Sequence, residues 1–374
     1  MSAPPTKPGH RVVVSEFAET PLEAIDQKMS LVAREPPDTA KLSTKDVVIS
    51  IKSASVGWVD LLMTSGQYQH MPKPPYCPGL EYAGVVAWTG ADAERLVSVG
   101  DEVLVDGLLA GPRSLGDYQA YGGYASYGVA PAEAVRRIPG GLSFDQACNL
   151  LGSYETAYHC LVTRGRVQPG ETVLVHGAAG STGLAAVHVA KLLGATVIAT
   201  GRSDAKLEVV KSQGADHTIN CKNPDGATGV RSFRAEVKAL TDGRGVDVVY
   251  DCVGGDISLE SLRAVRFGAR FLVVGWAATP FVAQGKGQRG APNANVLPTH
   301  LIMMKGLDVL GCPMVISTVH DMTLRPPRLE KIFQWVEAGQ IRPHVSHVFP
   351  LAQYKEAMRA KWNGDVIGGC VLHP

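Results

Sequence analysis

The stretch Val173-Leu-Val-His-Gly177-Ala-Ala-Gly180-Ser-Thr-Gly183 decides the fold of this 374-residue chain. It begins in a compact apolar run that predicts a buried strand, Thr172–His176, and it leads into an apolar stretch with helical spacing, Leu184–Leu193. In such a turn the first glycine permits the tight bend, the second lets the backbone approach a pyrophosphate, and the third lets the helix pack closely on the strand. The free N–H groups and the dipole of the helix start attract phosphates.

The turn therefore predicts a dinucleotide site formed by Gly177, Ala178, Ala179, Gly180, Ser181, Thr182 and Gly183. The alternative is that the glycines only shape a strand-to-helix turn.

Strands and helices alternate along the second part of the chain, beginning with the strand that leads into this turn. From about Leu151 onward we expect strands at Thr172–His176, Thr196–Thr200, His217–Ile219, Asp247–Val253, Arg270–Gly275 and Asp308–Gly311. Between them we expect helices at Leu184–Leu193, Ala205–Ser212, Arg231–Leu240 and Ile257–Val265, and a further helix at Leu329–Ala338. This alternation indicates βαβ units and a parallel sheet. The first 150 residues instead carry short β-branched runs separated by Gly, Pro and Asp, which indicates a strand-rich region.

The residues about 20 positions after the glycine turn indicate which dinucleotide is bound. A site for NAD expects Asp or Glu at the end of the second strand, where the carboxylate binds the ribose hydroxyls. This chain has Gly201, Arg202 and Ser203 there, with Lys206 one turn later. Two cations and a hydroxyl favour a 2′-phosphate, so the predicted cofactor is NADP(H). The alternative is that Arg202 and Lys206 are a solvated helix start.

Composition excludes several classes of protein. The chain has 36 Lys+Arg against 35 Asp+Glu and a formal net charge of +1, which argues against a nucleic-acid binder that neutralises many phosphates. No stretch of about 18 uninterrupted apolar residues predicts a membrane span, and the first ten residues lack the apolar core of a secretion signal. The seven cysteines are scattered, with no CxxC pair, and are expected to be buried thiols. We therefore expect a cytoplasmic protein.

The whole chain resembles the medium-chain dehydrogenase/reductase superfamily, in its zinc-independent quinone oxidoreductase and enoyl reductase branch. The resemblance rests on the glycine turn and on four further segments: Pro78-Gly-Leu-Glu81-Tyr-Ala-Gly84, Val99-Gly-Asp-Glu-Val103, Gly122-Gly-Tyr-Ala-Ser-Tyr127 and Gly339-Gln-Ile-Arg-Pro343. It implies an α/β fold: a Rossmann doubly wound parallel sheet at 151–312, and a discontinuous GroES-like, partly open β-barrel catalytic domain at 1–150 and 313–374. It also implies a homodimer formed through the sheet edge at Leu307–Gly311.

The resemblance identifies the positions at which a catalytic zinc ion would be bound. Where zinc-dependent relatives place catalytic ligands, this chain has Gly57 or Trp58, Leu80 and Leu151, none of which can bind zinc. Without a Lewis acid, hydride delivery to an electrophilic partner is the feasible chemistry. We expect NADPH-dependent reduction of a quinone or of the C=C bond of an α,β-unsaturated carbonyl compound (enone, enal or enoyl thioester). The rival hypothesis is a redox-silent NADPH-binding sensor or structural protein of the same fold, which Gly57 favours because relatives commonly have Asn there.

The resemblance also proposes site residues. The stretch from Gly57 to Tyr68 resembles the family segment that lines the substrate cleft, with Trp58 and Asp60 in the cleft and Tyr68 as a candidate catalytic proton donor or, alternatively, an aromatic wall. Asp60 is expected to have a structural hydrogen-bonding role. Thr156 matches the position packed under the nicotinamide. The remaining cofactor contacts are expected after two strands, at Val253 and Gly254 and at Val274, Gly275 and Trp276.

One segment breaks the pattern. Residues 277–300 have almost no periodicity and are expected to form a long polar loop, in which Lys286 and Arg289 either meet an acidic substrate tail or are simply solvated.

Overall fold

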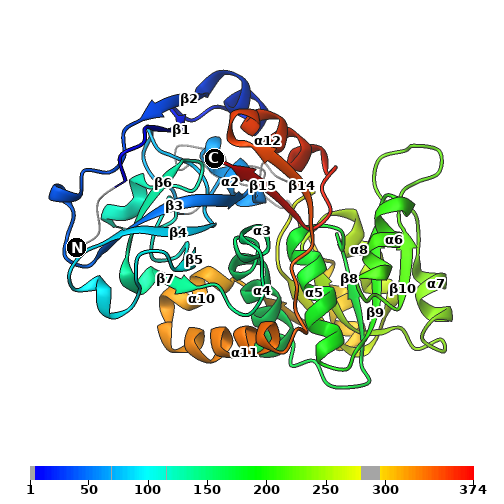
Figure 1. The fold of residues 1–374 in the computed structure, drawn as a ribbon. Helices are drawn as coiled ribbons and strands as arrows, with labels where there is room; N and C mark the ends of the chain where they lie inside the picture. The colour runs from blue at the N-terminus through cyan, green and yellow to red at the C-terminus, as the bar shows by residue number, and fades with distance from the viewer. Residues whose placement is uncertain (1–4, 69, 115, 279–294) are drawn as a thin grey trace. The chain divides into compact units, whose positions relative to one another are not determined.

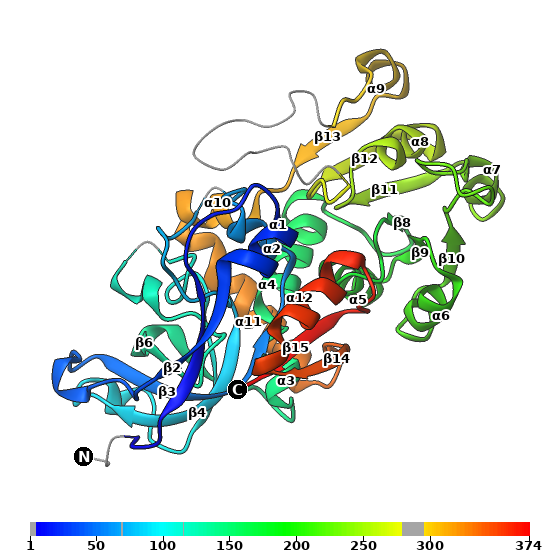
Figure 2. The same ribbon diagram turned by 90° about the horizontal axis from the view of Figure 1, so that it is seen from above.

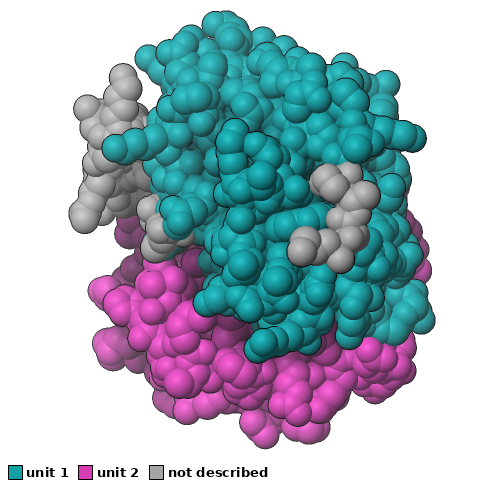
Figure 3. Space-filling view, turned by 60° about the vertical axis from the view of Figure 1, so that its left-hand side comes forward, with its two compact units in different colours: residues 1–152, 283–290, 342–374 teal, residues 153–282, 291–341 magenta. Residues whose placement is uncertain are grey.

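The computed structural model describes residues 5–68, 70–114, 116–278 and 295–374 (Figure 1). The chain divides into two compact units, which are coloured separately in Figure 3. Unit 1 contains residues 1–152, 283–290 and 342–374, and unit 2 contains residues 153–282 and 291–341. Among the described residues, no helix is long and apolar enough to cross a membrane.

Unit 2 is built on a six-stranded parallel sheet with the strand order β10-β9-β8-β11-β12-β13. The strands are β8 (Thr172–Val175), β9 (Thr196–Gly201), β10 (His217–Asn220), β11 (Val246–Asp251), β12 (Val265–Val273) and β13 (Asp308–Gly311). This is the doubly wound order 3-2-1-4-5-6 of dinucleotide-binding domains, in which the direction of winding reverses between β8 and β11. The expected Rossmann sheet is confirmed.

Helices cover both faces of this sheet, as Figure 2 shows. On one face lie α5 (Ser181–Leu192) and α6 (Asp204–Ser212), and on the other lie α7 (Arg234–Ala239) and α8 (Asp256–Ala264). The other helices of the unit are α4 (Leu151–Tyr158), which starts at the last residues of unit 1, a π-helical turn η6 (His159–Arg164), α9 (Thr299–Lys305), α10 (Met314–His320) and α11 (Arg325–Glu337). The core strands are apolar because both faces are covered: Val173, Leu174 and Val175 are fully buried.

Unit 1 is mainly antiparallel. Its seven-stranded sheet has the order β14-β15-β3-β4-β5-β7, with β6 also paired to β3, and a separate ribbon joins β1 and β2. The strands are β1 (Gly9–Val14), β2 (Met29–Arg34), β3 (Asp46–Ser55), β4 (Tyr82–Thr89), β5 (Glu102–Val105), β6 (Tyr127–Pro131), β7 (Val135–Arg137), β14 (Val345–Pro350) and β15 (Gly369–His373). The helices are α1 (Pro21–Glu23), α2 (Trp58–Thr64), α3 (Phe144–Ala147) and α12 (Tyr354–Asn363). The sheet path does not close on itself among the described residues, as expected for a partly open barrel.

Three expectations about elements need correction. Strand β12 starts at Val265 rather than Arg270, because Val265 pairs with Val246 across an irregularity in the register. The predicted loop at 277–300 ends in α9, and its part at 279–294, with Lys286 and Arg289, lies outside the described residues. Residues 313–341, expected in the catalytic domain, group with unit 2.

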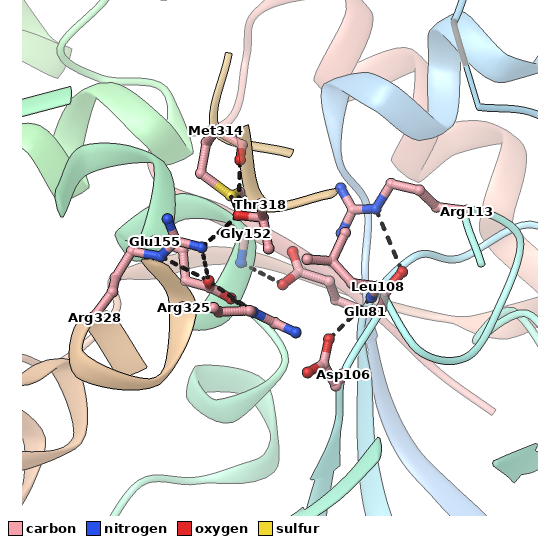
Figure 4. A network of polar contacts seen from close by, with 11 residues as sticks. Glu81, Asp106, Leu108, Arg113, Gly152, Glu155, Met314, Thr318, Arg325 and Arg328 are labelled. Atoms are coloured by element: carbon pink, nitrogen blue, oxygen red, sulfur yellow. Dashed lines mark hydrogen bonds and ion pairs between the residues drawn. The ribbon is translucent and has the colours of Figure 1, made fainter. Parts of the chain in front are cut away.

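A buried ion-pair network explains why 313–341 group with unit 2. Glu155 on α4 accepts hydrogen bonds from Arg325 Nη2 at 2.7 Å and from Arg328 Nε at 2.9 Å, both on α11. Arg328 also donates to Thr318 Oγ1 of α10 at 2.8 Å (Figure 4). All three charged side chains are 5% exposed or less. Removing one member of such a network leaves buried charge without its partner.

We therefore expect Glu155→Gln to lower the free energy of unfolding by about 3 kcal/mol, because glutamine keeps the shape but removes the charge that two arginines share. Urea unfolding followed by circular dichroism measures this. The matched control is Glu236→Gln, whose carboxylate pairs with Arg231 at the surface of the same unit and should cost under about 1 kcal/mol. Equal costs for the two substitutions contradict the prediction.

Candidate dinucleotide and substrate sites

The glycine turn joins β8 to α5 as the sequence predicts. Gly177 has φ +61°, a conformation that side-chain-bearing residues rarely adopt. A Cβ atom on Gly183 would lie 2.3 Å from the carbonyl oxygen of Gly177, so only glycine lets α5 approach this closely. Gly180 is the exposed N-cap of α5, and Ser181 and Thr182 form the half-buried first turn. This 12-residue helix therefore presents its N-terminal N–H groups beside an uncrowded backbone, which fits a pyrophosphate.

The loop after β11 lies against this turn. A Cβ atom on Gly177 would be 3.0 Å from Val253 Cγ2, so the two loops meet where the winding of the sheet reverses. Asp251 fixes the second loop: its Oδ1 accepts hydrogen bonds from the backbone N–H of Val253 and of Gly254, both at 2.9 Å. Ser258 donates to the other carboxylate oxygen.

The loop after β12 joins the same region. The N–H groups of Val274 and Gly275 donate to the carbonyl oxygen of Asp251 at 2.9 and 3.2 Å, and Trp276 is 47% exposed. The residues predicted after β8, β11 and β12 are thus brought together at the carboxyl edge of the sheet.

A buried histidine supports the base of the turn. His176 Nδ1 lies 2.8 Å from Thr200 Oγ1, and His176 Nε2 lies 2.6 Å from Ser261 Oγ, which links the ends of β8 and β9 to α8. Burial lowers the pKa of His176 to about 4, so the ring is neutral at pH 7 and serves as a structural hydrogen-bonding group.

Four residues are expected to decide which dinucleotide is bound, and we call them the selector residues. They lie at the end of β9 and the start of α6. Gly201 ends the strand, Ser203 is the N-cap of α6 with no side-chain capping bond, Arg202 is exposed and Lys206 is half-buried. No carboxylate stands at the strand end itself. Asp204 does lie in the first turn of α6, where it is exposed and accepts a hydrogen bond from Asn220 Nδ2 at 2.8 Å.

A third cation at this end was missed. Arg231 donates to the carbonyl oxygen of Asn220. Burial raises the pKa of the neighbouring Cys221 thiol, while the positive charges of Arg202 and Arg231 lower it. Both cations therefore lie near this thiol. Arg231 follows β10, and only the parallel pairing of β9 and β10 brings it near the selector residues. A polar loop residue of this kind gave no sequence signal.

Thr156 lies on α4 and is half-buried. Its helix is attached to α5 by the hydrogen bond between the Tyr154 hydroxyl and His188 Nδ1, at 2.7 Å. Within unit 2, α4 is thus held to α5, the helix that starts at the glycine turn.

The predicted substrate-cleft segment belongs to unit 1. Asp60 is 2% exposed, and its carboxylate accepts hydrogen bonds from the backbone N–H of Gly57 at 2.9 Å and from those of Gly79 and Leu80 at 3.1 Å each. Burial raises the pKa of Asp60 to about 6, although the three hydrogen bonds lower it. Asp60 therefore ties the start of α2 to the Pro-Gly-Leu-Glu motif, the structural role that the sequence favoured.

Two aromatic residues complete this segment. Tyr68 is half-buried after α2, and its ring meets the ring of His70 edge to face with centroids 6.4 Å apart. Trp58 stacks on Trp362 of α12, with centroids 5.3 Å apart and planes 5° from parallel. No sequence pattern indicated that Trp362 would lie at this segment. The described residues contain no cluster of three or more His, Cys, Asp or Glu side chains arranged to hold a metal ion.

The fold and the glycine turn define a dinucleotide-binding oxidoreductase architecture, and comparison with known proteins agrees. One family model, an alcohol dehydrogenase GroES-like domain, matches residues 43–140, and another, a zinc-binding dehydrogenase, matches residues 181–324. The quinone oxidoreductase-like protein 2 homolog of Nematostella vectensis is 32% identical over 90% of this chain and 85% of its own length. The chain belongs to the medium-chain dehydrogenase/reductase superfamily, in its quinone oxidoreductase branch.

Solved structures show the same fold. A probable oxidoreductase from Mycobacterium abscessus has a TM-score of 0.77 and 27% identity, covering 99% of this chain and 100% of its own. The quinone oxidoreductase of Escherichia coli, solved in complex with NADPH, has a TM-score of 0.76 and 23% identity, covering 98% and 100%.

Proposed function

We propose that this protein is a zinc-independent oxidoreductase that transfers hydride from NADPH to a quinone or to the C=C bond of an α,β-unsaturated carbonyl compound. The observation that carries the proposal is the glycine turn at the winding reversal of the sheet, where a Cβ atom on Gly183 would collide with the backbone of Gly177. NADPH supplies the hydride. The turn Gly177–Gly183 would hold the pyrophosphate, and the loops at Val253–Gly254 and Val274–Trp276 would border the rest of the dinucleotide.

After hydride transfer, residues of the substrate segment have to stabilise the negative charge that forms and supply a proton. When hydride adds to the β-carbon of an enone, negative charge develops on the carbonyl oxygen, and a proton must then reach the α-carbon. A hydroxyl can donate that proton or orient the water that does. The segment has three, but the hydroxyls of Thr64 and Ser65 donate to backbone carbonyl oxygens of α2, so Tyr68 is the candidate. Asp60 is unsuited to this task because its carboxylate accepts three backbone hydrogen bonds.

One feature supports NADPH over NADH as the cofactor, and another supports a cytoplasmic location. Arg202, Ser203 and Lys206 supply cations and a hydroxyl at the end of β9, where a 2′-phosphate would lie. All seven cysteines are free thiols, which suits a reducing compartment such as the cytosol.

A homodimer is also proposed. Among the described residues, β13 is an outermost strand of the sheet of unit 2. Exposed apolar side chains lie on β13, on the preceding α9 and on the neighbouring β12: Val309 is 37% exposed, Met303 73%, Met304 65% and Phe267 75%. A strand edge with apolar neighbours favours pairing with a second copy.

The first test incubates the purified protein with NADPH and a panel of quinones, enones and enoyl thioesters. We expect NADPH oxidation with at least one substrate class, and deuterium from labelled NADPH at the β-carbon of any reduced enone. Tyr68→Phe should lower kcat about 100-fold while the affinity for NADPH is unchanged, since it removes only the hydroxyl. Tight NADPH binding with no turnover across the panel overturns the proposal in favour of the redox-silent binding protein.

The cofactor preference is tested with Arg202→Ala. Loss of a charge-assisted phosphate contact should raise the Kd for NADPH about 10- to 100-fold and leave the Kd for NADH unchanged, as measured by nucleotide fluorescence. Arg244→Ala removes an exposed cation elsewhere in unit 2 and serves as the control. Equal weakening of NADPH and NADH binding by Arg202→Ala counts against a 2′-phosphate site.

The dimer is tested by light scattering after size exclusion. The wild type should elute with twice the chain mass of 39.7 kDa, and Val309→Asp should shift it toward one chain mass because the charge is placed on the strand edge. Val319→Asp, on an exposed position of α10, is the control and should leave the mass unchanged. A monomeric wild type refutes this part of the proposal.

A further inference from the structure

The two-stranded ribbon of β1 and β2 in unit 1 carries two arginines on one face (Figure 1). In its register Gly9 lies opposite Arg34, and Arg11 lies two residues beyond Gly9 on β1. Because side chains two residues apart on a strand point to the same face, Arg11 and Arg34 are diagonal neighbours, about 7 to 8 Å apart. Both side chains are half-buried, so water screens the repulsion between their charges only in part.

Both arginines lie against the segment 121–128. The guanidinium carbon of Arg34 is 5.0 Å from the centre of the Tyr121 ring. Arg11 forms an isolated antiparallel bridge with Ala125, which places β1 beside the same segment. The two positive charges therefore meet one stretch of chain.

Tyr82, the first residue of β4, lies along this segment and is 1% exposed. A Cβ atom on Gly123 would be 3.0 Å from Cδ1 of its ring, and a Cβ atom on Gly128 would be 2.6 Å from its hydroxyl oxygen. Burial raises the pKa of the Tyr82 hydroxyl, whereas the positive charge of Arg34 lowers it, and burial is the larger effect. The hydroxyl is therefore protonated at pH 7 and can donate a hydrogen bond.

Three donor groups at this place lack an acceptor. Arg11 Nε, Arg34 Nη1 and the Tyr82 hydroxyl are buried and have no hydrogen-bond partner in the part of the chain that the structure describes. Neither arginine forms an ion pair with a described residue, whereas Arg137 of the same unit pairs with Asp101. Buried donors and cations without partners are costly, and a ligand that satisfies them recovers that cost.

The neighbouring groups do not neutralise the two arginines. Burial lowers the pKa of Arg34, and the positive charge of Arg11 lowers it further, although Cys77 acts in the opposite direction. Burial raises the pKa of the Cys77 thiol to about 12, so the thiol is neutral at pH 7. The face of the Tyr121 ring attracts the guanidinium but carries no net charge. The cluster thus keeps a double positive charge.

We propose that Arg11, Arg34 and the Tyr82 hydroxyl bind a phosphate group, either as inorganic phosphate or as the phosphate of a phosphomonoester. A phosphate dianion matches the charge of two arginines, and its oxygens accept the charge-assisted hydrogen bonds that a guanidinium donates in pairs. The inference goes beyond the proposed function, because all three residues belong to unit 1 and none is a predicted cofactor or substrate residue.

The experiment measures thermal unfolding of the full-length protein in sodium phosphate and in sodium chloride of equal ionic strength. The wild-type Tm should rise with phosphate concentration, because a ligand that binds only the folded state stabilises it. Arg34→Met keeps an apolar stem and should lose the part of this rise that is due to binding. The general stabilisation by phosphate through exclusion from the surface is common to all variants, so the difference from the wild type decides. Arg137→Gln is the control and should keep the full rise.

Tyr82→Phe supplies a second variant, which also decides the matter if Arg34→Met fails to fold. It removes only the hydroxyl and should raise the Kd for phosphate about 10-fold in calorimetric titration. Its Tm in sodium chloride should not fall, because the buried hydroxyl has no partner to lose. A structural role for the hydroxyl would give the opposite result, a lower Tm and an unchanged Kd.

Titrations with inorganic phosphate and with glycerol 3-phosphate distinguish the two sources, since the true ligand should bind more tightly. Equal phosphate-dependent rises of Tm in the wild type, Arg34→Met and Tyr82→Phe overturn the inference. Its failure is distinguishable from failure of the proposed function, because none of these measurements requires turnover and Arg34→Met should bind NADPH with the wild-type Kd.

Discussion

The close approach of α5 to β8 is the constraint on which the dinucleotide site depends. The helix can start this near the strand only if Gly183 carries no Cβ atom, since that atom would lie 2.3 Å from the carbonyl oxygen of Gly177. Glycine costs conformational entropy in a helix, so its presence at the third position of α5 needs such a reason. The benefit is a helix N-terminus placed directly at the carboxyl edge of the sheet, where its N–H groups face a ligand.

That geometry is held rigid by buried polar groups rather than by the turn itself. His176 connects the ends of β8 and β9 to α8, and Asp251 fixes the loop after β11 through Val253 and Gly254. Each of these groups is buried and hydrogen-bonded, which is how a polar residue can be kept inside a core without a large penalty. The loops are thus in position before any ligand arrives, so less ordering has to accompany binding.

The sequence allowed prediction of the features that are local. The glycine turn, the bounds of β13 and the parallel sheet implied by alternating strands and helices follow from patterns within single βαβ units. Features that depend on distant segments were missed or misplaced. Glu155 and Arg325 are 170 residues apart, and their pairing assigns α11 to unit 2 instead of the catalytic domain. Trp362 lies on a helix near the C-terminus whose partner, α2, lies in the first part of the chain, and no spacing rule connects the two.

The electrostatics of the substrate segment narrow the chemical roles of its residues. Asp60 has the environment of a structural acceptor: three N–H groups from two loops point at one buried carboxylate. With its pKa raised to about 6, Asp60 is mainly ionised at pH 7 and is therefore a poor proton donor, whereas the step after hydride addition requires one. Tyr68 can supply the proton, and the Asp60 carboxylate holds the start of α2 against the loop at Gly79 and Leu80.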